Sequence, residues 1–117
     1  MTTNRTVQDL WDDIAALVAW LDAKNGRDPH EITLRVGKIA EEFGEVWQAL
    51  AGSLGQNPRK GRTHTTGDVA AELCDVIVTA AVALATITGP EQAGVHLDSK
   101  IAALMARAGL TTVEVHP

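Results

Sequence analysis

Two short acidic segments contain the residue types and the spacing that could hold a metal ion. They read EEFGE, beginning at Glu41, and ELCD, beginning at Glu72. In a helix, residues three apart share a face, so Glu42 would lie beside Glu45. The same spacing would place Glu72 beside Asp75. Two packed helices could bring these carboxylates together, and their mutual repulsion would require a cation. Oxygen ligands favour Mg²⁺ or Mn²⁺ over zinc or copper.

Four helices are predicted to position these segments, because apolar residues recur at three- and four-residue spacing along most of the chain. Asp28 and Pro29 are typical of a helix start, and Gly26 and Gly109 are typical of helix ends. The predicted helices cover residues 6–25, 28–51, 68–88 and 90–109, and a loop covers 52–67. No strand pair is recognisable in the body of the chain. We therefore expect an all-α fold resembling a four-helix bundle, with the acidic segments on its second and third helices.

The apolar positions of the second and third predicted helices suggest more burial than one chain provides. A single stripe on the second helix, which we expect to be buried, comprises Ile32, Val36, Ile39, Phe43, Val46 and Leu50. The third helix has no charged side chain from Val76 to Thr88, which indicates burial on all sides. A four-helix monomer rarely surrounds a helix so completely. We therefore expect a homo-oligomer, either a homodimer or a homotetramer, that completes the bundle.

Length and composition limit the class of protein. The chain has 117 residues, 45% of them hydrophobic, which suits a single domain spanning residues 1–117. Its net charge of -5 argues against a nucleic-acid partner, which normally requires a basic surface. The start of the sequence does not resemble a signal peptide and the apolar run at 76–88 is too short to cross a bilayer, so we expect a cytoplasmic protein without a membrane segment. The single cysteine, Cys74, excludes an internal disulfide and is expected to be a buried thiol.

Both acidic segments resemble the motifs of a known family. The sequences KIAEEFGEV, from Lys38, and AELCDVIVTA, from Ala71, resemble the EExxE and ExxD pair of the MazG-like all-α nucleoside triphosphate pyrophosphatases. The resemblance implies Mg²⁺-dependent hydrolysis of a nucleoside or deoxynucleoside triphosphate between the α and β phosphates, giving a monophosphate and pyrophosphate. It also implies that the metal ligands are Glu42, Glu45, Glu72 and Asp75. The further acid, Glu41, would bind a second ion or orient the attacking water.

Cations are needed against the phosphates of such a substrate. Lys38 lies one helical turn before Glu42, and an ordinary surface role is the alternative for it. The resemblance implies a lysine and an arginine on the last helix, to which Lys100 and Arg107 would correspond. Leu104 stands where the family often has an asparagine, so this chain departs from the family pattern there.

The predicted loop and one tryptophan supply further candidates for substrate binding. Arg59, Lys60 and Arg62 form a basic centre that could close over bound phosphates, although a solvated linker is the simpler interpretation. His64, in the same loop, could titrate near neutral pH or be a plain polar residue. Trp47 could stack on the nucleotide base, or it could belong to a core or a subunit interface.

Two other interpretations stay open. A phosphoribosyl-ATP pyrophosphohydrolase is built on similar helices and acids, and only substrate tests separate it from the first hypothesis. A non-catalytic helical interaction or regulatory module would keep the bundle and use its acids for solubility. In that case no divalent ion would stabilise the protein.

Overall fold

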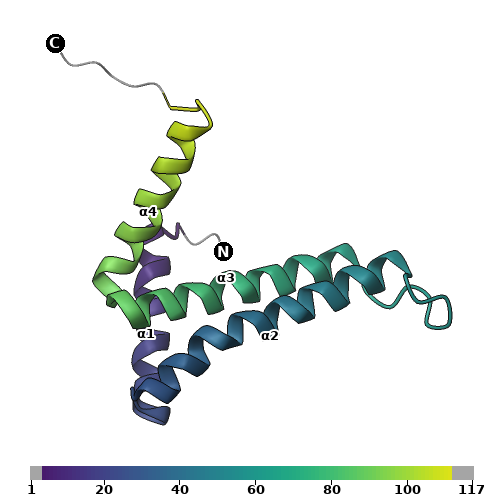
Figure 1. Cartoon of the computed structure of the whole chain (residues 1–117), viewed down its shortest axis with the longest axis horizontal. Coiled ribbons are helices and arrows are strands. Elements are labelled where there is room, and N and C mark those ends of the chain that lie inside the picture. The colour runs from purple at the N-terminus through teal and green to yellow at the C-terminus, as the bar shows by residue number, and fades with distance from the viewer. Residues whose placement is uncertain (1–3, 112–117) are drawn as a thin grey trace.

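The computed structural model describes residues 4–111, and all the regular secondary structure in that range is helical. The helices are α1 (Val7–Asn25), α2 (Pro29–Leu54), α3 (Thr66–Thr88) and α4 (Pro90–Arg107). They follow one another along the chain with short connections (Figure 1). The prediction of an all-α protein is therefore confirmed.

A capping box determines where α3 begins. The Thr65 hydroxyl accepts a hydrogen bond from the backbone N–H of Asp68, and the Asp68 carboxylate accepts one from the backbone N–H of Thr65, at 3.2 and 2.8 Å. This reciprocal pair satisfies two of the N–H groups that a helix start leaves without partners. The predicted start at Asp68 was thus too late, because Asp68 is the partner of the cap and lies within the first turn.

The α2 helix begins where the sequence predicts and ends later than predicted. Asp28 caps it by accepting a hydrogen bond from the Glu31 N–H at 2.8 Å, and Pro29 occupies its first turn. The helix continues to Leu54 and ends at Gly55, whose left-handed φ of 65° favours glycine. The connection between α2 and α3 is therefore limited to residues 55–65.

The helices form an open assembly instead of one compact bundle. α2 and α3 pack along each other as an antiparallel hairpin, which projects away from α1 and α4 (Figure 1). α1 packs against α3, and α4 packs against both. The radius of gyration is 18.2 Å, whereas a compact domain of this length would have about 13 Å. One chain alone therefore does not form a closed four-helix bundle, and completion of the bundle by a second copy stays a prediction.

A small core lies where α1, α3 and α4 meet. Its buried members are Val18, Val82, Ala85 and Ala93, with Trp11, Ile14, Leu21 and Leu84 packed against them. Gly94 allows α4 to approach Trp11 of α1 closely, because a Cβ at this position would lie 3.0 Å from the indole nitrogen. No large side chain among the described residues is less than 2% exposed.

Several positions that the sequence predicted to be buried are exposed in the single chain. In the α2 stripe Val46 is buried, but Val36, Phe43 and Leu50 are exposed. In α3, residues near the core are buried, whereas Ile77 is 67% exposed. The reason is geometric, since each helix of a two-helix hairpin has a neighbour on one side only. Cys74 is likewise exposed, so the prediction of a buried thiol is wrong for the single chain.

α3 is also notable for its apolar composition. By length and composition alone, its 23 residues from Thr66 to Thr88 would suffice to cross a membrane, although core helices of soluble proteins pass the same criterion. Glu72 and Asp75 lie within it. The expectation of no membrane segment rested on the uncharged residues 76–88 alone, whereas the apolar helix begins earlier, at Thr66.

Candidate metal centre

Three carboxylates meet halfway along the hairpin. Glu42 and Glu45 come from α2 and Glu72 comes from α3, and one oxygen of each lies within 4.8 Å of the others. The spacing of three residues places the first two on one face of α2, and the antiparallel packing brings Glu72 opposite them. The structure thus brings together three of the four acids that the resemblance assigned to a metal.

The charges of this acidic cluster (Glu42, Glu45 and Glu72) are poorly compensated. The Glu42 side chain is only 12% exposed, and its nearest cation is the ammonium group of Lys38, 3.4 Å away. One oxygen of Glu72, Oε2, is buried and has no hydrogen-bond partner among residues 4–111. A buried carboxylate oxygen without a partner is costly, so this atom indicates that a ligand or a proton completes the site.

Repulsion within the cluster changes the proton affinity of Glu45. Its pKa is raised above the ordinary value, first by the neighbouring charge of Glu42, then by partial burial and by the charge of Glu72. This is the response expected when like charges share a site without a counter-ion. A bound cation would reverse the effect, since it favours the ionised form.

The donor set suits a hard divalent cation. Mg²⁺ binds oxygen at about 2.0–2.1 Å and Ca²⁺ at about 2.3–2.6 Å, so oxygens of one ion lie up to about 4–5 Å apart. Separations of up to 4.8 Å agree with the Ca²⁺ distances, and around Mg²⁺, whose oxygens lie at most about 4.2 Å apart, the side chains would move closer together. No histidine or cysteine belongs to the cluster, which disfavours zinc and copper. The residues present therefore fit Mg²⁺ or Mn²⁺.

The other two acids of the motifs lie outside the cluster. Asp75 is exposed on α3, one turn beyond Glu72, and Glu41 is exposed on α2 beside Glu42. Neither belongs to the group of oxygens within 4.8 Å of one another. The assignment of Asp75 as a fourth ligand and of Glu41 to a second ion stays a prediction.

The candidate substrate-binding residues are dispersed in the single chain. Lys38 borders the cluster, as its spacing predicted. Trp47 is 65% exposed on α2, so no pocket surrounds it within this chain. Lys100 is exposed on α4, which extends away from the hairpin (Figure 1). Arg59 and Lys60 lie in the connection at the far end of the hairpin, beyond the cluster.

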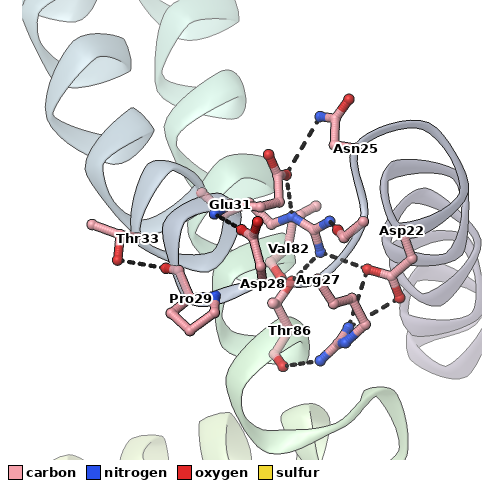
Figure 2. Close-up of polar contacts among 11 residues, drawn as sticks. Asp22, Asn25, Arg27, Asp28, Pro29, Glu31, Thr33, Val82 and Thr86 are labelled. Atoms are coloured by element: carbon pink, nitrogen blue, oxygen red, sulfur yellow. Dashed lines mark hydrogen bonds and ion pairs between the residues drawn. The ribbon is translucent and has the colours of Figure 1, made fainter.

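A second group of charged residues on α2, centred on Arg35, was not predicted from the sequence. Its guanidinium lies 2.9 Å from Asp22 and 2.7 Å from Glu31, and it donates to the backbone oxygen of Gly26 and the hydroxyl of Thr86 at 3.0 and 3.2 Å. Asp22, Glu31 and Thr86 belong to α1, α2 and α3 (Figure 2), and Gly26 lies in the connection between α1 and α2.

This Arg35 network fixes the angle between α1 and the hairpin. Arg27 reinforces it by pairing with Asp22 at 3.0 Å and by donating to the backbone oxygen of Thr86 at 2.9 Å (Figure 2). Burial lowers the pKa of Arg35, but the hydrogen bonds and charges of Glu31 and Asp22 outweigh it, so the net shift is upward. The only sequence signal was the four-residue spacing from Glu31, which is typical of a helical ion pair.

Comparison with protein families, with curated proteins and with solved structures found no match for this chain.

Proposed function

We propose that this protein is a Mg²⁺-dependent nucleoside or deoxynucleoside triphosphate pyrophosphohydrolase that produces a monophosphate and pyrophosphate. The observation that carries the proposal is the acidic cluster with its unpartnered, buried Glu72 oxygen. Buried charge of one sign needs a counter-ion, and the spacing of the acids matches the family motifs described above. The proposal places the protein in nucleotide metabolism in the cytoplasm.

Each residue of the cluster has a definite task in this proposal. Glu42, Glu45 and Glu72 would hold the metal, which when bound offsets the phosphate charge and lowers the pKa of a coordinated water. Glu41, exposed beside the cluster, would orient the attacking water or help hold a second ion. Asp75 would join the ligands by a change of rotamer.

Lys38 would contact the phosphates. It lies beside Glu42 and is 53% exposed, so its ammonium group can leave the carboxylate at little cost when a phosphate arrives. The net charge of -5 makes such help necessary, because an acidic protein repels a triphosphate.

A second copy of the chain would complete the fold and the substrate site. On α2 the exposed apolar residues Phe43, Trp47 and Leu50 follow the acids by one to five positions, and on α3 Leu73 and Ile77 do the same. In two antiparallel helices, residues that follow the facing acids by the same number of positions turn toward the same side of the pair. The exposed apolar residues of α2 and of α3 therefore lie on one side of the hairpin. Soluble monomers rarely leave an apolar face of this kind uncovered. A homodimer or homotetramer would cover it.

A membrane is a poorer way to cover this face. α2 pairs with α3 along the hairpin and carries Arg35, Lys38 and four glutamates, which would be expensive to place in lipid.

The test is release of pyrophosphate from a panel of ribo- and deoxyribonucleoside triphosphates in the presence of Mg²⁺. Wild type is compared with Glu42→Gln and Glu72→Gln, and with Glu91→Gln as a control that removes the same charge from exposed α4. We expect turnover in the wild type and the control, and a loss of at least about a hundredfold in the cluster variants. Adding phosphoribosyl-ATP to the panel distinguishes the related enzyme. If no nucleotide is turned over and Mg²⁺ does not bind, the exposed apolar face favours the interaction module instead.

A further inference from the structure

The connection between α2 and α3 borders a half-open cavity, lined by both polar and apolar groups, at the tip of the hairpin. Its volume is about 350 Å³. The residues that matter for its chemistry are Gln48, Gly52, Asn57, Lys60, Thr63 and His64. None of them belongs to the acidic cluster, so this tip cavity is a separate feature of the molecule.

The cavity has ordered walls because its connection is hydrogen-bonded to itself and to α2. The Thr63 N–H donates to the Gly52 carbonyl at 3.0 Å, which ties the returning chain to the helix. The Asn57 carbonyl accepts from the N–H groups of both Lys60 and Gly61 at 3.1 and 3.0 Å. Gly61 has a φ of 67°, a conformation that other residues rarely adopt. Residues 55–65 thus form a defined loop and not a free linker.

Gly52 makes possible the close contact between α2 and the loop residues Thr63 and His64. A Cβ at this position would lie 2.3 Å from Nδ1 of His64 and 2.5 Å from the hydroxyl of Thr63. No side chain other than hydrogen fits there without displacing one wall of the cavity. Any substitution of Gly52 therefore disturbs the tip cavity while leaving the acidic cluster in place.

The loop concentrates positive charge in an acidic protein. Arg59, Lys60 and Arg62 are three of the ten basic residues of the chain, which has a net charge of -5. Among residues 4–111 the ion pairs involve other cations, and none of these three has an acidic partner. Lys60 lines the cavity directly. A cavity lined by a lysine that has no acidic partner among residues 4–111, together with amide and hydroxyl side chains, is suited to an anion.

The tip cavity lies on the same flank of α2 as the acidic cluster. Glu45, Gln48 and Gly52 are separated by three and four residues, so their side chains share one face. Glu45 and Gly52 are about 10 Å apart along the helix axis, at a rise of about 1.5 Å per residue. An anion held by Lys60 would thus be a short distance from a metal held by the cluster.

We propose that the tip cavity is a binding site for an anion of the phosphate class, with Lys60 as its principal cation. The anion is either the phosphate chain of the nucleotide or a separate phosphate ligand. The first of these sources rests on the proposed function. The site itself does not, because it can be measured without metal and without hydrolysis.

The experiment is calorimetric titration of the full chain with inorganic pyrophosphate in EDTA. We expect saturable binding to the wild type, at least tenfold weaker binding to Lys60→Ala, and a similar loss in Gly52→Ala. Lys24→Ala, which removes one positive charge from the exposed end of α1, should bind like the wild type. Absence of binding to the wild type, or equal weakening by Lys60→Ala and Lys24→Ala, would overturn the proposal. Circular dichroism spectra should show that Gly52→Ala remains helical, and unchanged binding by that variant would also overturn it.

A second titration identifies the source of the anion and separates this proposal from the hydrolase. Pyrophosphate is added in Mg²⁺ to protein saturated with a non-hydrolysable triphosphate analogue. Competition assigns the cavity to the phosphates of the substrate, and simultaneous binding assigns it to a separate ligand. Metal-free binding that depends on Lys60 in a protein that hydrolyses no nucleotide would support the cavity and refute the hydrolase. Hydrolysis without such binding would do the reverse.

Discussion

Two groups of charged side chains on α2 differ in how completely their charges are matched. Arg35 is only 5% exposed, and each of its nitrogens has a partner from the surrounding helices. The acidic cluster, two turns further along, has three carboxylates against one half-exposed lysine, and its buried Glu72 oxygen has no partner within residues 4–111. A buried charge that is fully matched holds the fold together. One that is left unmatched costs stability, and in the proposed function a bound cation would offset that cost.

The largest expected effect is the loss of the Arg35 network. Arg35→Ala would leave Asp22 and Glu31 close together without their shared cation, which destabilises a protein by about 3–5 kcal/mol when the pair is buried. Urea unfolding at fixed protein concentration measures this. The matched variant is Arg27→Ala, whose side chain is 45% exposed and whose ion pair should contribute about 1 kcal/mol or less. Equal effects of the two variants would remove the distinction between the two charged groups.

The acidic cluster should behave in the opposite way. Glu72→Gln removes one of three repelling charges, so in EDTA its unfolding free energy should equal or exceed that of the wild type by up to about 1 kcal/mol. In Mg²⁺ the wild type should gain about 2.7 kcal/mol at an ion concentration a hundredfold above its dissociation constant, and Glu72→Gln should gain nothing. Thermal unfolding in EDTA and in Mg²⁺ measures both. If Glu72→Gln unfolds the protein, the acids are structural.

Features of α2 that depend only on nearby residues could be predicted from the sequence. Helix starts such as Asp28 with Pro29, and the i, i+3 spacing of Glu42 and Glu45, depend on neighbours within one turn and were therefore predictable. The Thr65 cap was also a local signal, of the S/T-x-x-D kind, although the predicted helix began only at Asp68.

Features that depend on distant partners could not be predicted in this way. Arg35 meets Asp22 and Thr86, which are 13 and 51 residues away, and no spacing rule connects them. Phe43 is exposed because few helices surround the hairpin, and the number of neighbouring helices cannot be predicted from the apolar pattern of one helix. The fit of the loop against Gly52 similarly requires the returning chain. Local periodicity thus identified the elements and most of the cluster, but not the angles between helices or the tip cavity.

The pH dependence of stability should have opposite signs in the two groups. The pKa of Asp22 is lowered, because hydrogen bonds from Arg35 and Arg27 outweigh the upward effect of burial. Its stabilising contribution is present above its unfolded pKa, with an ordinary value of 3.8, and is lost as the pH falls through the folded pKa. The pKa of Glu45 is raised, chiefly by Glu42, so its contribution is present below the ordinary 4.5 and is lost as the pH rises through the folded value.

Unfolding free energies in metal-free buffer between about pH 2.5 and pH 7 measure these opposite slopes. Relative to Asp22→Asn, the wild type should gain stability as the pH rises toward the ordinary value of 3.8 and change little above it. Relative to Glu45→Gln, it should lose stability as the pH rises above the ordinary value of 4.5. Two slopes of the same sign would contradict the view that one group is matched and the other is not. Mg²⁺ should abolish the second slope and leave the first unchanged, since only the cluster would bind the ion.

The smallest expected effect concerns Lys38, which in the described part of the chain is the one cation that touches the acidic cluster. Because Lys38 is half exposed, its pair with Glu42 should contribute about 0.2–1 kcal/mol, so Lys38→Met should destabilise the metal-free protein by no more than that. Its affinity for Mg²⁺ should not fall, because the variant makes the cluster more negative. If Lys38 contacts phosphate, KM for the nucleotide should rise while Mg²⁺ binding is kept, as measured by titration and initial rates. If Lys38 only neutralises Glu42, Mg²⁺ takes over that task and KM should not change. The variant therefore decides whether Lys38 only neutralises Glu42 or also binds the substrate.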